Sequence, residues 1–258
     1  MPQTATWTIL GSGGGAATAD RASSGYLLET PQESIMFDCG DGVTGSFLRC
    51  GKRYEDIDAV LISHTHPDHF CGLPFFLQQL YLVRRRGELL VYLPGEAVAG
   101  LKTFLDLNYL FIEHFGFSVR FLAFADNQKI TFNDLSIIPR ANTHLTAHRG
   151  QPWMAGLDNR GECFSFEIEY RTMRMAYSSD IGSLDDLHFC AGCHTLVVET
   201  THVPLPELFA RAEKWGVRRI VLTHLGPEFA PDFAARAASR FHGKTIIAAD
   251  GLVISLSE

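Results

Sequence analysis

In the stretch His64-Thr65-His66-Pro67-Asp68-His69, four candidate metal ligands fall within six residues. Neutral imidazole and carboxylate groups are good ligands for zinc and for its first-row neighbours. The preceding residues, 59–63, are apolar and mostly β-branched or aliphatic, which predicts a buried strand. We expect Pro67 to stop that strand, so that the ligands lie on a loop at its end.

Composition and charge narrow the classes of protein to consider. The 258 residues are 46% hydrophobic and 20% charged, and the formal net charge is -7. The absence of a basic stripe favours a small-molecule substrate over long nucleic acid. No apolar run reaches the roughly 18 residues of a membrane span, and no secretory signal is visible, so we expect a cytoplasmic protein without membrane contact. The sequence shows no linker, and we expect a single domain over residues 1–258.

Apolar runs predict strands interleaved with helices along the whole chain. Residues 25–29 and 34–38 are predicted to form a hairpin, and residues 164–170 to pair with 174–177 across a tight turn. Hairpins mixed with strand–helix units favour two sheets with helices outside. Helices are predicted at 43–50, 72–86, 97–109, 205–215 and 231–241. Further strands are predicted at 6–10, 89–93, 119–124, 129–132, 135–140, 195–199, 219–223, 245–249 and 252–256.

Three more polar residues each follow an apolar strand and begin a loop: His144, Asp180 and His224. Residues at the ends of several strands can converge on one edge of a sheet sandwich. With the first motif they make five histidines and two aspartates, enough for two metal ions that share one ligand. In the loop after residues 135–140 we prefer His144 as the metal ligand, because it directly follows its strand, and His148 is the alternative.

With this pattern the chain resembles the metallo-β-lactamase-fold superfamily over essentially its full length. The HxHxDH signature of that family is met by residues 64–69. The resemblance implies a four-layer αββα sandwich of two mixed sheets with helices outside. It also implies a first metal site made by His64, His66 and His144, a second made by Asp68, His69 and His224, and a bridging carboxylate, Asp180.

Further segments resemble the branch of the family that contains tRNase Z and related phosphodiesterases. Residues 35–42, IMFDCGDG, are similar to a strand and turn of that branch, whose aspartate, here Asp38, supports a ligating histidine. Residues 197–200 fall where tRNase Z carries a His-Glu-Ala-Thr signature, but Val198 stands in place of its histidine. His202 is a candidate replacement. The long basic arm that grips tRNA is missing, so we do not expect full tRNA processing.

These observations predict a dinuclear metal-dependent hydrolase in which a metal-bridging hydroxide attacks a phosphodiester or a cyclic phosphate. The candidate catalytic residues are Asp68, which could orient the nucleophile, and Glu199 with His202, which could protonate the leaving group. Zinc is the favoured cofactor, and iron or manganese would also suit these ligands. Two alternatives are a hydrolase of a lactone, thioester or β-lactam, and a metal-binding sensor or scaffold without turnover. A homodimer is one option for the assembly.

Two motifs carry weaker signals. Cys190-Ala191-Gly192-Cys193 has redox or zinc-knuckle spacing, but it lacks a partner pair, and we expect two partly buried free thiols. The glycine loop at residues 11–15 could cradle a phosphate with its backbone N–H groups or support the metal site. A tight turn required by packing is the alternative for that loop.

Overall fold

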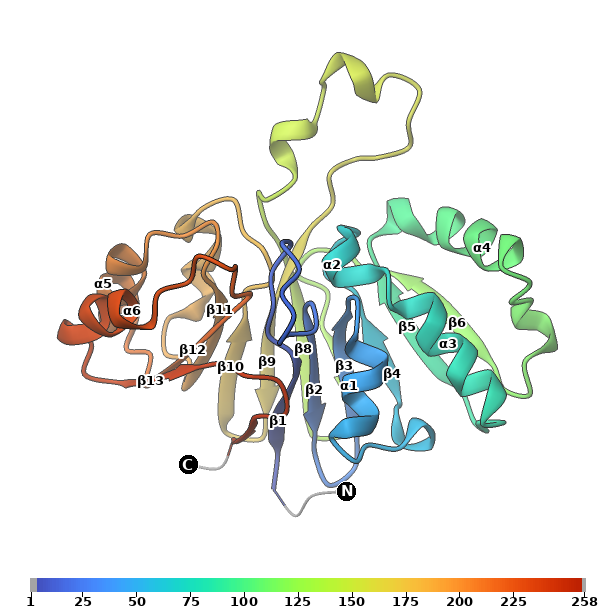
Figure 1. Cartoon of the computed structure of the whole chain (residues 1–258), viewed down its shortest axis with the longest axis horizontal. Coiled ribbons are helices and arrows are strands. Elements are labelled where there is room, and N and C mark those ends of the chain that lie inside the picture. The colour runs from blue at the N-terminus through green and yellow to red at the C-terminus, as the bar shows by residue number, and fades with distance from the viewer. Residues whose placement is uncertain (1–3, 257–258) are drawn as a thin grey trace.

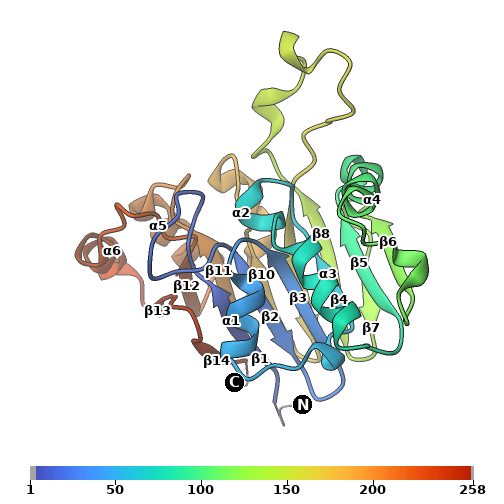
Figure 2. The ribbon, with the colours of Figure 1, turned by 45° about the vertical axis from the view of Figure 1, so that its right-hand side comes forward.

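The computed structural model describes residues 4–256, except for the side chain of Trp153. Two seven-stranded sheets pack face to face, and helices cover their outer faces (Figure 1). The predicted αββα sandwich is therefore confirmed. Figure 2 shows the same layers from the side of α3 and α4.

The first sheet has the strand order β14-β1-β2-β3-β4-β5-β6. The strands from β14 to β3 pair antiparallel, and those from β3 to β6 pair parallel, with helices in the crossover connections. Its strands are β1 (Thr6–Gly11), β2 (Gly25–Glu29), β3 (Ser34–Cys39), β4 (Ala59–Leu61), β5 (Leu89–Leu93), β6 (Val119–Ala123) and β14 (Val253–Ser255). The helices of this half are α1 (Val43–Arg49), α2 (Pro67–Phe70), α3 (Leu73–Leu82) and α4 (Val98–Leu107).

The second sheet repeats this plan with the order β13-β12-β11-β10-β9-β8-β7. The strands from β7 to β10 pair antiparallel and those from β10 to β13 pair parallel. Its strands are β7 (Ile130–Phe132), β8 (Leu135–Ala141), β9 (Phe164–Tyr170), β10 (Met173–Tyr177), β11 (Thr195–Glu199), β12 (Arg219–Thr223) and β13 (Lys244–Ile247). Its helices are α5 (Leu205–Trp215) and α6 (Pro231–Ala237).

Three apolar cores hold the layers together. The central core lies between the sheets, where the rings of Trp7, Phe37, Phe166 and Tyr177 pack at centroid separations of 5.2 to 6.2 Å. A second core lies under the helices of the first half, and a third lies under α5 and α6. Since both inner sheet faces are buried in one core, the two sheets have a fixed position relative to each other, and their strand ends meet at a common edge.

The structure corrects the expected role of Pro67. Strand β4 already ends at Leu61, and the backbone leaves the sheet ladder before Pro67 is reached. The Ile62 N–H still donates to the carbonyl of Tyr92, but the Ser63 N–H donates to Asp38 Oδ1 at 2.7 Å. Pro67 is instead the first residue of helix α2, a position where its missing N–H costs no hydrogen bond. Two of the predicted ligands therefore lie on a helix rather than on a loop.

Several predicted boundaries also shift, among them that of the last helix, α6, which ends at Ala237 instead of residue 241. Helix α3 stops at Leu82 instead of residue 86, because Arg84 adopts a left-handed conformation with φ 54°. Strand β13 covers 244–247 rather than 245–249. It pairs with a single neighbour, β12, and the last pair of residues is Leu222 with Ile247. Within residues 4–256, no helix is both long and apolar enough to span a membrane.

Candidate metal centre

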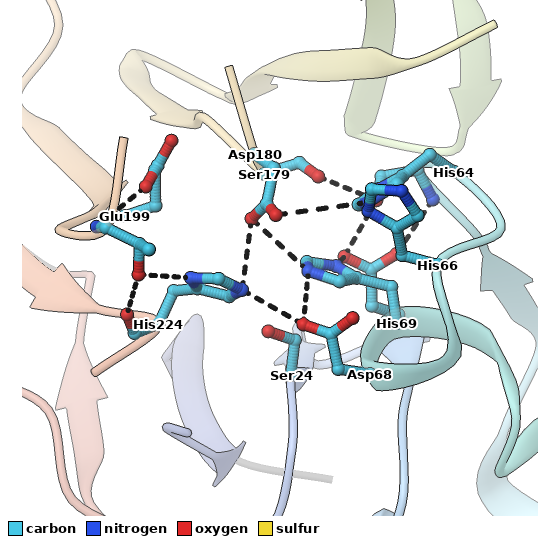
Figure 3. A network of polar contacts seen from close by, with 12 residues as sticks. Ser24, His64, His66, Asp68, His69, Ser179, Asp180, Glu199 and His224 are labelled. Carbon is cyan, nitrogen blue, oxygen red and sulfur yellow. Dashed lines mark hydrogen bonds and ion pairs between the residues drawn. The ribbon is translucent and has the colours of Figure 1, made fainter. Parts of the chain in front are cut away.

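The seven predicted ligands lie together at the edge where strands of both sheets end. Figure 3 labels six of them, all except His144. The HxHxDH segment follows β4, and the other three ligands follow β8, β10 and β12. Their ligand atoms form two groups, in each of which all atoms lie within 4.8 Å of one another. The first group is His64, His66, His144 and Asp180, and the second is Asp68, His69, Asp180 and His224.

The first group surrounds one oxygen of Asp180. His144 Nε2 lies 3.7 Å from Asp180 Oδ2, and His64 Nε2 lies 4.0 Å from the same oxygen. His144 Nε2 is also 3.3 Å from His66 Nδ1. The Nδ1 atom of His64 contacts the Ser63 hydroxyl at 3.0 Å, which leaves Nε2 facing the group. The space between these atoms is bordered by three imidazoles and one carboxylate.

The second group surrounds the other oxygen of Asp180. His69 Nε2 lies 3.2 Å from Asp180 Oδ1, and His224 Nε2 lies 3.3 Å from it. Asp68 Oδ2 completes the group, at 3.5 Å from His69 Nε2 and 3.1 Å from His224 Nε2. Asp180 thus presents one carboxylate oxygen to each group, which is the geometry expected of a bridging ligand.

The residues present fit a divalent metal ion in both groups. The buried atoms His64 Nε2, His69 Nε2 and Asp180 Oδ1 have no hydrogen-bond partner among the described residues, although such orphaned atoms are costly without one. A cation would satisfy all of them. Imidazole nitrogens with carboxylate oxygens form a donor set that suits zinc, iron or manganese.

The electrostatics of the cluster favour the metal-binding protonation states of His64, His144 and Asp180. For His69, the effect of burial is outweighed by the nearby carboxylates of Asp180 and Asp38, which raise the pKa well above its usual value. Burial holds the pKa of His64 well below its usual range and lowers that of His144 to about 4, so both imidazoles are neutral ligands at neutral pH. Burial by itself would raise the pKa of Asp180, but the nearby His69 and His224 outweigh it and hold that pKa well below the usual range. The bridging group is therefore a carboxylate rather than an acid.

A buried hydrogen-bond network built on Asp38 orients the ligands. Its Oδ2 accepts from His69 Nδ1 at 2.9 Å, from the Tyr177 hydroxyl at 2.6 Å and from the Ser63 hydroxyl at 3.0 Å. Asp38 and Tyr177 come from different sheets, so the network ties the two halves together behind the cluster. A carboxylate behind a ligating imidazole fixes its ring orientation and raises its basicity. Of this network, the sequence indicated only the support that Asp38 gives.

Three residues at the cluster have strained backbone conformations. Asp38, Ser179 and His224 have left-handed conformations with φ between 51° and 56°, which non-glycine residues rarely adopt. Such strain costs on the order of 1–3 kcal/mol per residue and persists where surrounding contacts enforce it. Here the hydrogen bonds of Asp38 and His224 supply those contacts. The sequence contains no signal for these conformations.

The glycine loop at residues 11–15 passes directly beside the cluster. A Cβ atom on Gly14 would lie 3.0 Å from His224 Nδ1, and one on Gly15 would lie 3.5 Å from Asp68 Oδ2. Larger side chains here would enter the space around both ligands. The loop is also fixed by Asp250, whose carboxylate accepts from the Ser12 N–H at 2.9 Å. The loop therefore borders the ligand cluster, a position that is compatible with the supporting role proposed from the sequence.

Glu199 and His202 lie at the rim of the cluster, next to Asp180. Glu199 is buried and accepts hydrogen bonds from the backbone N–H groups of Ile181, Thr201 and His202. Glu199 Oε1 also lies 3.0 Å from His202 Nδ1, and that hydrogen bond raises the pKa of His202. His202 Nδ1 is 4.0 Å from Asp180 Oδ2. Glu199 thus holds the imidazole, and His202 is the more exposed member of the pair.

The structure also places His148, the Cys190–Cys193 pair and the segment 145–161. His148 belongs to neither ligand group of the described chain, whereas His144 belongs to the first. Cys190 and Cys193 are free thiols, as expected, and both are fully buried rather than partly buried. Residues 145–161 project from the edge of the sandwich as an arm between β8 and β9 (Figure 2).

A sequence model of the family described as "Beta-lactamase superfamily domain" matches residues 33–225, which is more than half of the chain and includes all seven residues of the cluster. The chain belongs to this family, a class of metallo-β-lactamase-fold hydrolases whose fold implies divalent metal ions.

Several individual proteins are similar to the chain, among them relatives named Ribonuclease Z. It is 27% identical over 310 residues to a Ribonuclease Z of Synechococcus sp. (strain CC9311), covering 97% of this chain and 98% of the relative. It is 32% identical to a Ribonuclease Z of Methanosarcina acetivorans over 100 residues, which are 39% of this chain and 32% of that relative. The structure of the metallo-β-lactamase fold protein YhfI from Bacillus subtilis is similar with a TM-score of 0.77 and 24% identity, covering 98% of this chain and 99% of that one.

Proposed function

We propose that this protein is a dinuclear metal-dependent hydrolase of phosphodiester substrates, with zinc as the favoured metal. The observation that carries the proposal is the position of Asp180, which gives one carboxylate oxygen to each of two ligand groups. Two relatives named Ribonuclease Z match the chain over nearly its full length and support this substrate class.

In this proposal, His64, His66 and His144 hold the first ion, while Asp68, His69 and His224 hold the second. When bound, the ions lower the pKa of a water molecule and stabilise negative charge on the phosphate oxygens. Asp38 fixes the ring of His69 through Nδ1, so that Nε2 faces the cluster. Asp68, whose side chain is 13% exposed, can orient the nucleophile from its position beside His224.

His202 is the residue that we assign to leaving-group protonation. Its Nδ1–H donates to buried Glu199, which leaves Nε2 to deliver a proton on the side of the cluster where the ring is exposed. In that role Glu199 is a positioning residue, since its oxygens are occupied by backbone N–H groups and by His202. A positioned proton donor of this kind contributes about a hundredfold or more to the rate.

The test is hydrolysis of bis(p-nitrophenyl) phosphate by the protein loaded with zinc or manganese. We expect turnover by the wild type, and a loss of about a hundredfold in kcat for His202→Ala with unchanged metal content. His188→Ala, at an exposed histidine outside the cluster, is the matched control and should behave as wild type. No turnover with either metal would overturn the proposed substrate class, and full activity of His202→Ala would overturn the assigned proton donor.

A further inference from the structure

An apolar pocket opens directly beside the second ligand group. Its cavity of about 590 Å³ lies between the loop after β11, the loop after β12 and the glycine loop. This volume is in the range of small-molecule sites. Neither the ligand clusters nor the proton donor uses this pocket.

Two of the pocket's walls are also walls of the metal centre. Gly15 lines the pocket, and its Cβ position lies 3.5 Å from Asp68 Oδ2. Thr201 lines it as well, and its hydroxyl lies 3.0 Å from His224 Nδ1 while donating to the His224 carbonyl. The pocket and the second ligand group therefore adjoin each other at these two residues.

The chemistry of the walls selects what can bind there. Val203, Phe229 and Phe233 supply apolar surface, and Glu228 is the single charged side chain among the described residues that line the pocket. Two arginines, Arg236 and Arg240, line the adjoining hollow between α5 and α6, which shares Pro206 and Phe233 with this pocket. A phosphate group that entered this pocket would meet the Glu228 carboxylate and no positively charged side chain among the lining residues. An apolar group would instead gain free energy by leaving water.

We propose that this pocket binds a neutral, apolar or aromatic ester arm of the substrate, adjacent to the phosphorus atom that the metal centre holds. The inference rests on the proposed function and narrows its substrate class. It favours small phosphodiesters with one bulky apolar group over a polyanion such as RNA, whose next phosphate would fall among these apolar walls.

The test compares the binding of phenylphosphonate and methylphosphonate to the zinc-loaded protein by calorimetry. Both anions present the same phosphonate to the metals, and only the first has a group that can fill the pocket. We expect phenylphosphonate to bind about tenfold more tightly, because its ring is buried. Equal binding of the two anions, with bis(p-nitrophenyl) phosphate still hydrolysed, would overturn the inference but not the proposed function.

Two variants locate the preference. Phe233→Ala removes a wall whose side chain is 45% exposed, and Ala230→Trp fills the pocket from an exposed position. Each should reduce the phenyl preference about fivefold and leave methylphosphonate unchanged. Phe104→Ala, at an exposed ring on α4, is the control and should keep the preference. A preference that both pocket variants retain would overturn the inference, and an absence of hydrolysis of any phosphodiester would instead overturn the proposed function on which it rests.

Discussion

The two halves of the molecule contribute to the metal centre in different ways. The first half supplies four candidate ligands from one segment, residues 64–69, which follows β4 and continues into α2. The second half supplies three single residues, each at the end of a different strand and separated from the next by at least 36 positions in the chain. The halves have similar sheets, so the difference lies in the loops that follow the strands.

This contrast shows which part of the site depends on local structure and which on the fold. The ligands of the first half are held by a short helix and by the hydrogen bonds of Asp38. Those of the second half meet only because β8, β10 and β12 are placed by the central core. Asp180 is the point at which the two contributions join, since it belongs to both ligand groups.

The largest effect is expected from Asp180→Ala. Removing the carboxylate that faces both groups should abolish bound metal at one or both positions and lower phosphodiester hydrolysis by at least about a hundredfold. Metal analysis and kinetics with bis(p-nitrophenyl) phosphate measure this. Asp106→Ala, on the outer helix α4, is the control. If Asp180→Ala kept both metals and the activity, the two halves would not share a ligand.

A second pair of variants tests the contribution of the second half. His144→Ala should weaken metal binding in the first group and reduce activity by about a hundredfold, because its Nε2 faces Asp180 at 3.7 Å. His148→Ala should change neither quantity, since His148 lies outside both groups of the described chain. The reverse result would show that the loop after β8 binds the metal through the other histidine.

A smaller effect is expected from Asp38→Asn, which alters the support of the first half without removing a ligand. The amide cannot accept from His69, Tyr177 and Ser63 together as the carboxylate does. We expect metal affinity to fall by about 10- to 100-fold, as for other residues behind a ligating histidine. Titration with a competing chelator measures the change, and an affinity equal to wild type would show that α2 alone positions His69.

The smallest effects concern the cysteines, whose reactivity is expected to differ between the two halves. Burial raises the pKa of Cys193 to about 11 and that of Cys190 well above its ordinary value, so both thiols stay protonated at neutral pH. In the native protein we expect iodoacetamide to modify exposed Cys71 of the first half and to spare this pair, as measured by mass spectrometry. Labelling of the pair as fast as in the unfolded chain would contradict their burial.

Much of the fold could be predicted from the sequence, because apolar periodicity is local. The hairpin of β2 with β3 and the pairing of β9 with β10 follow the predicted runs. Boundaries were less predictable: β4 ends early because Asp38, more than twenty residues away, captures the Ser63 amide. No local pattern reveals such a contact.

The candidate site was likewise predictable from the sequence only in part. The segment 64–69 is recognisable from its composition and spacing alone, and the three distant ligands were found because each follows an apolar strand. The link from Tyr177 to Asp38 and the left-handed φ of Ser179 depend on how the sheets pack, so the sequence could not indicate them. The apolar pocket was equally invisible, since its walls come from three separate loops.

The most direct test of a shared dinuclear centre is anomalous diffraction from crystals grown with zinc. We expect two zinc positions in each molecule, one among His64, His66 and His144 and the other among Asp68, His69 and His224, with Asp180 contacting both. Crystals that show no zinc at this edge, or a single ion that Asp180 does not contact, would contradict the account.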